Sequence, residues 1–257
     1  MNDIREPDAD TALLHIYGDL NDFLPADRRG TWFMRACKGH ETIKNVVEAC
    51  GVPHPEIAEL RVNGQPVGFD YLVRPGDRIE VLPAPLVATA TLALRPPLAE
   101  RRFVLDTHLG RLAAYLRMLG YDSLYRNDAE DAELARLAGD EQRILLTRDM
   151  GLLKRSAVIY GSFVREVIPS HQIVEVARRY NLSPAPTAFQ RCMRCNGLTA
   201  PVDKAAIEHL LEPKTRLYFD SFRRCTTCGK IYWQGSHYAR MLALLARVIQ
   251  HIQGATI

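Results

Sequence analysis

The stretch that decides the fold is Arg143-Ile144-Leu145-Leu146-Thr147-Arg148-Asp149, a short apolar run followed closely by an aspartate. The stretch Phe103-Val104-Leu105-Asp106 has the same pattern earlier in the chain. Each run has the length and composition of a buried strand. Because the carboxyl ends of parallel strands meet at one edge of a sheet, we expect Asp106 and Asp149 to lie in one crevice. Two carboxylates there favour Mg²⁺ or Mn²⁺, with substrate phosphate completing the coordination shell.

The sequence around these two runs alternates between strand-like and helix-like patterns. Apolar positions 109, 112, 116 and 119 share one helical face, and Gly120 ends that helix. Further helices are predicted at 131–138, 152–157 and 170–180, the last capped by Ser170, with strands at 124–125 and 163–167. This alternation predicts an α/β fold, with a mostly parallel sheet flanked by helices.

Length and composition indicate several domains. The chain has 257 residues, 47% of them hydrophobic and 25% charged. No apolar stretch approaches the roughly 18 residues of a membrane helix, so we expect a cytoplasmic protein without membrane contact. Prolines between 83 and 97 mark a boundary. We predict a first domain at 1–85, a linker at 86–101, an α/β domain at 102–185, and a final domain with a C-terminal helix at 186–257.

The first domain is predicted to be an α+β roll. A helix is expected at 42–50, with Thr42 as its N-cap and Gly51 just past its end. Strands are expected at 13–17, 31–34, 60–62 and 78–82. Few strands around one helix are typical of this class.

Three segments of this domain resemble ubiquitin-like β-grasp proteins, especially the small sulphur carriers: Ile43-Lys44-Asn45-Val46-Val47-Glu48, Val62-Asn63-Gly64 and Pro75-Gly76-Asp77-Arg78-Ile79-Glu80-Val81. Those carriers use a free terminal Gly-Gly. Here Leu82-Pro83-Ala84-Pro85 continues into another domain. The resemblance therefore implies the β-grasp fold and docking of a protein partner, and it argues against a role in sulphur transfer.

Residues 102–240 resemble the PIN-like ribonucleases named after the C-terminal part of the mutator-seven protein. Besides the two strand motifs, the resemblance rests on four further features: Leu109-Gly110-Arg111-Leu112-Ala113, Leu116-Arg117-Met118-Leu119-Gly120-Tyr121-Asp122, the cysteine pairs Cys192/Cys195 and Cys225/Cys228, and Gly235-Ser236-His237-Tyr238. It implies a metal-dependent ribonuclease, in which acidic residues at the carboxyl edge hold Mg²⁺ or Mn²⁺. A ubiquitin-like N-terminus is a known arrangement in that family.

The resemblance also assigns site residues. Asp106 and Asp149 match two metal-binding acids, and Asp131 is preferred for the middle acid because it opens a helix as the family acid does. Asp128 is the runner-up, and Glu166 is an open choice for a fourth acid. An alternative for Asp131 is a helix-start residue favoured by the helix dipole. Side chains that could bind phosphate are those of Arg111, Arg117, Thr147 and Arg148.

Two Cys-x-x-Cys pairs, Cys192 with Cys195 and Cys225 with Cys228, are separated by 29 residues. Four thiolates in two such pairs form a closed tetrahedral zinc site, which is structural rather than catalytic. Disulfides and an iron–sulphur cluster are the alternatives. The intervening segment is longer than in an ordinary zinc ribbon and contains a helix-like insertion at 203–211. Cys37 and Cys50 are expected to be small buried residues.

The final domain carries an excess of positive charge. Residues 186–257 hold ten Lys and Arg against four Asp and Glu, a net charge of +6 in a chain of net +3. Basic residues alternate there with Tyr232 and Trp233. This pattern suits single-stranded RNA, through phosphate contacts and base stacking, although the aromatic rings could equally pack the ribbon onto its neighbour. The main alternative function is an RNA-binding or adaptor protein without catalytic turnover.

Overall fold

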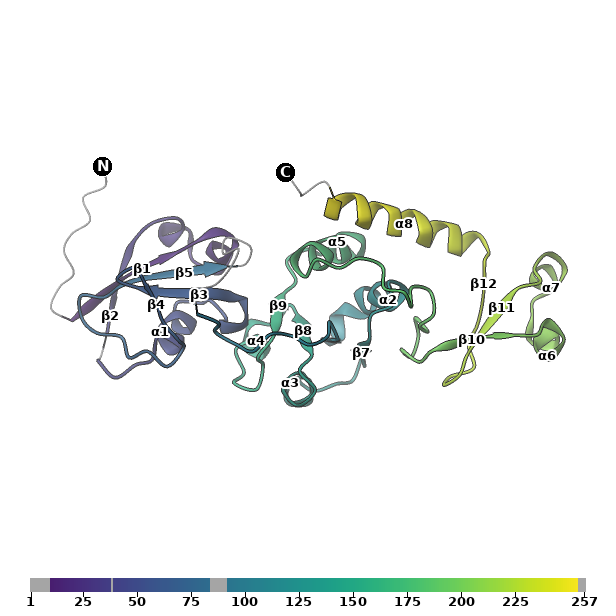
Figure 1. Ribbon diagram of the computed structural model, residues 1–257, viewed down its shortest axis with the longest axis horizontal. Coiled ribbons are helices and arrows are strands. Elements are labelled where there is room, and N and C mark those ends of the chain that lie inside the picture. Colours follow the sequence, from purple (N-terminus) through teal and green to yellow (C-terminus); the bar gives the residue numbers. More distant parts are fainter. Residues whose placement is uncertain (1–9, 38, 84–91, 254–257) are drawn as a thin grey trace. The chain divides into compact units, whose positions relative to one another are not determined.

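The computed structural model describes residues 10–37, 39–83 and 92–253 (Figure 1). The chain divides into two compact units. The first contains the described residues up to Ala99 together with Asp149–Phe163, and the second contains Glu100–Arg148 and the described residues from Val164 onward. Part of the predicted linker at 86–101 lies outside the described residues.

The first unit is built on a mixed five-stranded sheet of order β2-β1-β5-β3-β4. Its two central strands, β1 and β5, are parallel, and the other pairs are antiparallel. The predicted α+β roll with one principal helix is confirmed. The elements are β1 (Thr11–Ile16), β2 (Phe33–Ala36), α1 (Ile43–Ala49), β3 (Ile57–Val62), β4 (Gln65–Pro66) and β5 (Arg78–Pro83).

Helix α1 begins and ends as its sequence predicts. The Thr42 hydroxyl accepts a hydrogen bond from the Asn45 N–H at 3.4 Å. Gly51 follows the helix at φ +115°, where a Cβ atom would lie 2.6 Å from the Phe23 carbonyl oxygen. The buried face carries Ile43, Val46 and Val47 into the core of the unit. Glycine is therefore required at the end of this helix.

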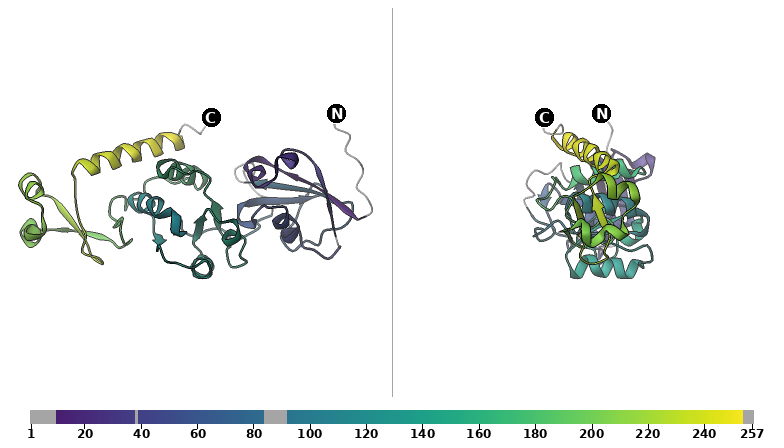
Figure 2. Two further views of the ribbon diagram at one scale, coloured as in Figure 1. Left: turned by 180° about the vertical axis from the view of Figure 1, so that it is seen from behind. Right: turned by 90° about the vertical axis from the view of Figure 1, so that its right-hand side faces the viewer.

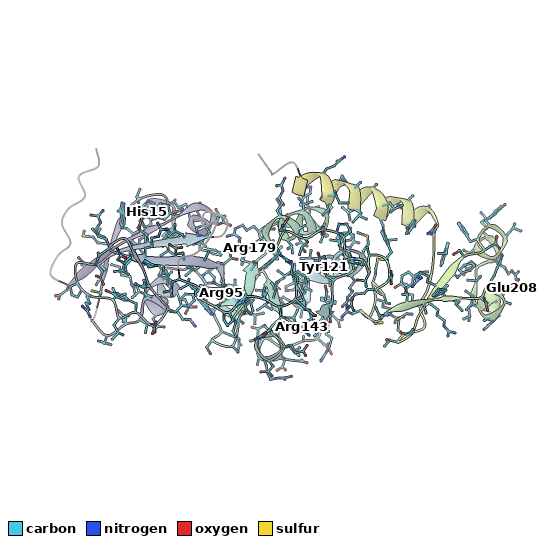
Figure 3. All side chains as sticks on the ribbon, viewed as in Figure 1. His15, Arg95, Tyr121, Arg143, Arg179 and Glu208 are labelled. Carbon is cyan, nitrogen blue, oxygen red and sulfur yellow. The ribbon has the colours of Figure 1, made fainter. Side chains whose placement is uncertain are left out.

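Residues 149–163 contain α4 (Met150–Leu153) and β9 (Gly161–Phe163), and they pack within the first unit. The Glu56 carboxylate accepts the Phe163 N–H at 2.6 Å. The His54 ring donates through Nε2 to the Val158 carbonyl at 2.7 Å. Figure 3 labels Arg95, whose guanidinium donates to the Pro55 carbonyl at 2.7 Å in the same unit. Side-chain to backbone hydrogen bonds thus hold this segment.

The predicted helix at 152–157 and strand at 163–167 are both displaced. The helix begins at Met150 because the Asp149 side chain caps it. The strand ends at Phe163. Beyond it, the backbone N–H groups of Arg165 and Glu166 bond to the Glu175 carboxylate, each at 2.9 Å, so they take no part in a strand ladder.

The second unit contains a sheet in which β6 lies between β7 and β8, with all three strands parallel. Every residue of β6 and β8 is buried, as expected for a parallel sheet covered by helices. The predicted α/β fold is confirmed. The elements are β6 (Phe103–Leu105), α2 (Gly110–Met118), β7 (Ser123–Tyr125), α3 (Asp131–Asp140), β8 (Ile144–Thr147) and α5 (Pro169–Arg179).

Two further details concern helices of this unit. Helix α5 starts at Pro169, with Ile168 in the N-cap position and no side-chain cap, so the predicted cap at Ser170 is wrong. Proline suits this first helical position because its missing N–H has no helical partner there. The C-terminal helix α8 (Ser236–Gln253) runs along α5 (Figures 1 and 2). None of the described helices is both long and apolar enough to cross a membrane.

The chain from 186 onward forms a small antiparallel sheet of order β10-β11-β12. Its strands are β10 (Thr199–Val202), β11 (Phe222–Cys225) and β12 (Ile231–Trp233). The insertion between β10 and β11 contains two short helices, α6 (Lys204–Ile207) and α7 (Pro213–Tyr218). The predicted helix at 203–211 is confirmed only in its first part, because a 3-10 turn follows α6.

Candidate functional site

Asp106 lies directly after β6, at the carboxyl edge of the parallel sheet. Its side chain is held by two neighbours: Oδ1 accepts the Thr107 N–H at 2.6 Å, and Oδ2 accepts the Thr147 hydroxyl at 2.8 Å. Asp106 is 7% exposed, and Thr147 is fully buried at the end of β8. These two hydrogen bonds therefore fix the orientation of the carboxylate.

The other acids occupy more open positions. Asp149 is exposed and caps α4, with Oδ1 accepting the N–H groups of Gly151 at 2.6 Å and Leu152 at 3.1 Å. Asp131 is half-buried at the first position of α3. Asp128 is exposed and pairs with Arg126 at 3.1 Å. Among the described residues, the carboxylates form no group of three that could hold a metal ion.

The four predicted phosphate-binding side chains differ in their exposure. Arg117 is 3% exposed and donates to the carbonyls of Ser123 at 2.9 Å and of Met193 and Arg194 at 3.0 Å. The guanidinium of Arg148 donates to three successive backbone carbonyls at 164–166, between 2.6 and 3.0 Å. The Thr147 hydroxyl donates a hydrogen bond to Asp106, as described above. Arg111, on α2, is exposed and is the best placed of the four to meet a ligand.

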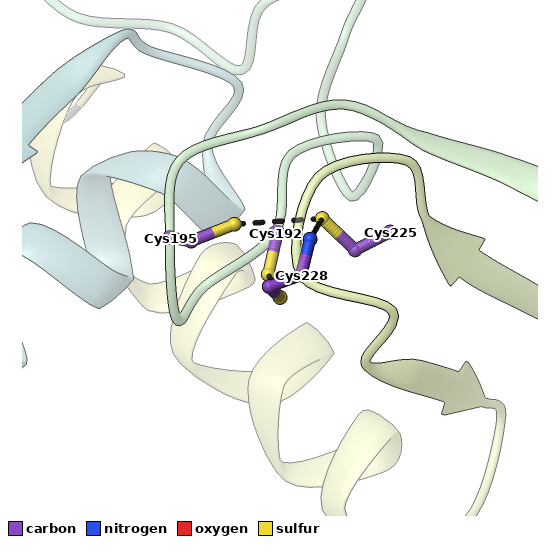
Figure 4. Close-up of side chains that lie close together, drawn as sticks. All are labelled: Cys192, Cys195, Cys225 and Cys228. Atoms are coloured by element: carbon purple, nitrogen blue, oxygen red, sulfur yellow. Dashed lines mark hydrogen bonds between the residues drawn. The ribbon is translucent and has the colours of Figure 1, made fainter.

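The four cysteines of the two Cys-x-x-Cys pairs converge (Figure 4). The Cys192 and Cys228 sulphurs are 3.6 Å apart, those of Cys195 and Cys225 are 3.4 Å apart, and all four lie within 4.8 Å of one another. A disulfide needs about 2.05 Å. Sulphurs around a tetrahedral Zn²⁺ with Zn–S bonds of about 2.3 Å would be about 3.8 Å apart. The donor set therefore fits zinc, and it is complete without water or substrate.

Two thiols of this cluster, those of Cys192 and Cys195, have pKa values shifted in opposite directions. Burial opposes ionisation of Cys192, but bonds from the Tyr232 hydroxyl and from backbone N–H groups lower the pKa of its thiol to about 6. Burial and the neighbouring sulphurs raise the pKa of Cys195 to about 12. The Tyr232 hydroxyl lies 3.1 Å from the Cys192 sulphur. The protein thus already favours a thiolate at one position of the cluster.

The first cysteine pair is attached to the amino edge of the parallel sheet. Asn196, at φ +70°, accepts the Ser123 N–H at 3.1 Å and donates to Asp122 Oδ1 at 2.7 Å. Asp122 also binds Arg143, which Figure 3 labels, at 2.9 Å. Burial opposes ionisation of Asp122, but the bonds from Arg143 and Asn196 prevail and lower its pKa. Because the strands are parallel, this edge is opposite the one that carries Asp106.

Two segments of the chain match known protein families. Residues 101–245 match the family described as the Mut7-C RNAse domain, and residues 9–86 match the family described as Mut7-C ubiquitin. The chain belongs to the Mut7-C RNAse family. The first match covers more than half of the chain and includes both Asp106 and the four cysteines. Comparisons with curated proteins and with solved structures found no match.

In this Mut7-C RNAse chain, the residues that attach the cysteine pair were not found from the sequence. Asp122 and Asn196 are polar residues beside glycine or tyrosine, and their spacing of 74 residues gives no signal of contact. The Asn196-Gly197 pair after the first cysteines predicts only a turn. The sequence likewise gave no signal that Arg117, predicted to bind phosphate from its place on the helix after Asp106, is buried and donates to the carbonyls of Met193 and Arg194.

Proposed function

We propose that this protein is a metal-dependent ribonuclease that hydrolyses phosphodiester bonds of RNA. One observation carries the proposal: in a chain of the Mut7-C RNAse family, a nearly buried aspartate, Asp106, is aimed by Thr107 and Thr147 at the carboxyl edge of a parallel sheet. This is the edge at which open α/β sheets bind their ligands.

The donor chemistry of the acids fits Mg²⁺ or Mn²⁺. A carboxylate oxygen has two lone pairs, so Asp106 Oδ2 can accept the Thr147 hydroxyl and still bind a hard cation. Asp131 and Asp149 would complete the set, with Asp128 as the alternative to Asp131. Such an ion, when bound, lowers the pKa of its water and neutralises charge on the phosphate. Arg111, on helix α2 shortly after Asp106 in the chain, would bind a neighbouring phosphate.

We further propose that the RNA is single-stranded, that the ubiquitin-like domain docks a protein partner, and that the protein works in the cytoplasm. Basic residues interleaved with Tyr232 and Trp233 in the segment 186–257 support the first point, because exposed aromatic rings can stack on unpaired bases. The resemblance of residues 9–86 to ubiquitin supports the second. Four clustered thiols suit a reducing compartment, which supports the third.

A second candidate function is an RNA-binding or adaptor protein without turnover. A specific observation favours it: the described carboxylates form no group of three around a common point. Both functions predict RNA binding, so cleavage must distinguish them.

The test is cleavage of end-labelled single-stranded and duplex RNA by the full chain, with Mn²⁺ or with EDTA, and with zinc content measured in every sample. The variants are Asp106→Asn and Asp149→Asn, with Asp140→Asn as the matched control, since that exposed acid pairs with Arg136 on α3. We expect cleavage with Mn²⁺ by the wild type and the control, and loss of about 100-fold or more in both test variants. Binding without cleavage under all conditions would favour the adaptor function.

A further inference from the structure

A small cavity opens in the second unit, among the loop at 189–193, the β11–β12 hairpin and the start of α8. Its volume is about 120 Å³. Pockets for drug-sized ligands hold roughly 300–1,000 Å³. The cavity therefore has room for about one ring system and not for a larger ligand.

The walls of the cavity are mainly aromatic rings and methionine side chains. Trp233 lines the cavity and is 40% exposed. The ring of Tyr238 packs on Phe189, with centroids 5.0 Å apart. Phe189 has φ +59°, a conformation that bulky residues rarely adopt and that tends to occur at functional sites. Flat, polarisable walls of this kind suit a flat aromatic ligand.

Two arginines on the lining are fixed in place. Arg191 donates to the carbonyls of Gly120 and Asn196, both at 3.1 Å. Arg223 donates to the hydroxyl of Thr199 at 3.0 Å and to its carbonyl at 2.6 Å. None of the described residues that line the cavity is acidic. The aromatic walls thus lie beside two guanidiniums whose charge no lining carboxylate offsets.

The lining also depends on the cysteine cluster. Tyr232 contributes to the lining, and its hydroxyl contacts the Cys192 sulphur at 3.1 Å. Met193, another lining residue, lies between the cysteines of the first pair, Cys192 and Cys195. Zinc bound by the four thiolates would hold this part of the cavity rigid.

We propose that this cavity binds one unpaired base of single-stranded RNA, with Trp233 stacking on the base and Arg191 and Arg223 binding the adjoining phosphates. A nucleotide joins a flat ring system to an anion within a short distance, which matches the pairing of aromatic walls and guanidiniums. In a duplex the bases are stacked inside and cannot enter, so the ligand is an unpaired base. This site deepens the proposed function, on which its choice of RNA rests, and it places substrate binding on residues outside the acidic edge.

Tryptophan fluorescence can test the site directly, because the chain has two tryptophans, Trp32 and Trp233. In a Trp32→Phe protein, Trp233 is the remaining tryptophan, and excitation at the long-wavelength edge of the tryptophan band avoids the ten tyrosines. We would titrate this protein with a short single-stranded RNA in buffer without Mg²⁺ or Mn²⁺, so that the result does not depend on cleavage. DNA of the same sequence and duplex RNA are the comparison ligands. We expect saturable quenching of Trp233 by single-stranded RNA and little by the duplex.

Variants identify the contacts. Trp233→Leu, followed by anisotropy of labelled RNA, should weaken binding by about 5- to 100-fold, and Trp233→Phe should restore most of it. Arg223→Gln should weaken binding and lower its salt dependence, whereas Arg216→Gln, an exposed arginine on α7, is the matched control. Zinc content and circular dichroism confirm that each variant is folded.

Three results would overturn the proposal: RNA binding with unchanged Trp233 fluorescence, equal binding by folded Trp233→Leu, and no binding of single-stranded RNA by the wild type. Equal quenching by duplex RNA would also contradict an unpaired base. A protein that quenches as expected but never cleaves RNA would refute the nuclease and leave this site standing, and the reverse result would refute only the site.

Discussion

The two edges of the parallel sheet differ in how their acids are used. At the amino edge, the Asp122 carboxylate accepts hydrogen bonds from Arg143 and Asn196. Through Asn196 it attaches the first cysteine pair to the sheet. At the carboxyl edge, the Asp106 carboxylate accepts hydrogen bonds from Thr107 and Thr147, and its oxygens keep lone pairs for a further ligand. Similar acids next to strands thus serve structure at one edge and are available for chemistry at the other.

The largest expected effect is at the amino edge. Cys225→Ser should abolish stoichiometric zinc binding and unfold the small sheet of β10, β11 and β12, because structural zinc contributes about 10–16 kcal/mol in small zinc domains. The readouts are zinc content by mass spectrometry of metals and the rate of proteolysis within 190–235. Cys37→Ser is the control, since Cys37 is buried in the other unit. A Cys225→Ser protein with full zinc and an intact ribbon would contradict the assignment.

The next effect concerns Asp122. Asp122→Asn should lower the free energy of unfolding by about 1.5–3 kcal/mol near neutral pH, because it removes charge-assisted bonds to Arg143 and Asn196. The pKa of Asp122 is below its usual 3.8, so this stability is present above 3.8 and is lost as the pH falls through the lowered folded-state pKa. Denaturant unfolding at several pH values should show the gap between variant and wild type closing in acid. A gap that is constant with pH would assign the loss to packing.

A smaller effect is expected at the carboxyl edge. Thr147→Val keeps the shape of the buried side chain and removes the hydroxyl that holds Asp106. Cleavage should fall by about 10- to 100-fold, as for outer-shell partners of metal ligands, and Thr147→Ser should restore it. The measurement is kcat and KM for RNA with Mn²⁺. An unchanged kcat in a folded Thr147→Val protein would show that Asp106 needs no such support.

The smallest effect extends the comparison to residues 149–163. Glu56→Gln replaces the charged acceptor of the Phe163 N–H with a neutral one, at a cost of about 0.5–1.5 kcal/mol. Hydrogen exchange at 149–163 should quicken modestly in this variant and much more in Glu56→Ala. Equal exchange in all three proteins would mean that other contacts hold the segment.

The sequence predicted the local features well. The cap at Thr42, the glycine after α1 and the buried strands β6 and β8 depend on neighbouring residues, whose spacing is visible in the chain. The convergence of the four cysteines was equally predictable, because two Cys-x-x-Cys pairs are typical of a structural zinc site. Cys37 and Cys50 are buried, as expected.

The sequence did not reveal the distant hydrogen-bond partners of several predicted site residues. Arg117 and Arg148 were predicted to bind phosphate. In the structure Arg117 is only 3% exposed and donates to the Met193 carbonyl, and Arg148 donates to the Val164 carbonyl. The boundaries at 149–163 were displaced because Asp149 caps a helix and Glu175 captures the backbone after β9.

Periodicity, capping residues and cysteine spacing are local features of the chain, and they were enough to predict an α/β core, an α+β N-terminal domain and a candidate zinc site. The tertiary structure decided which polar side chains bond to other parts of the protein. Arg117 and Asp122 form such hydrogen bonds, whereas the oxygens of Asp106 keep lone pairs that can accept a further ligand. The physical reason is that a charge inside a protein must find partners, and those partners can come from any distance along the chain.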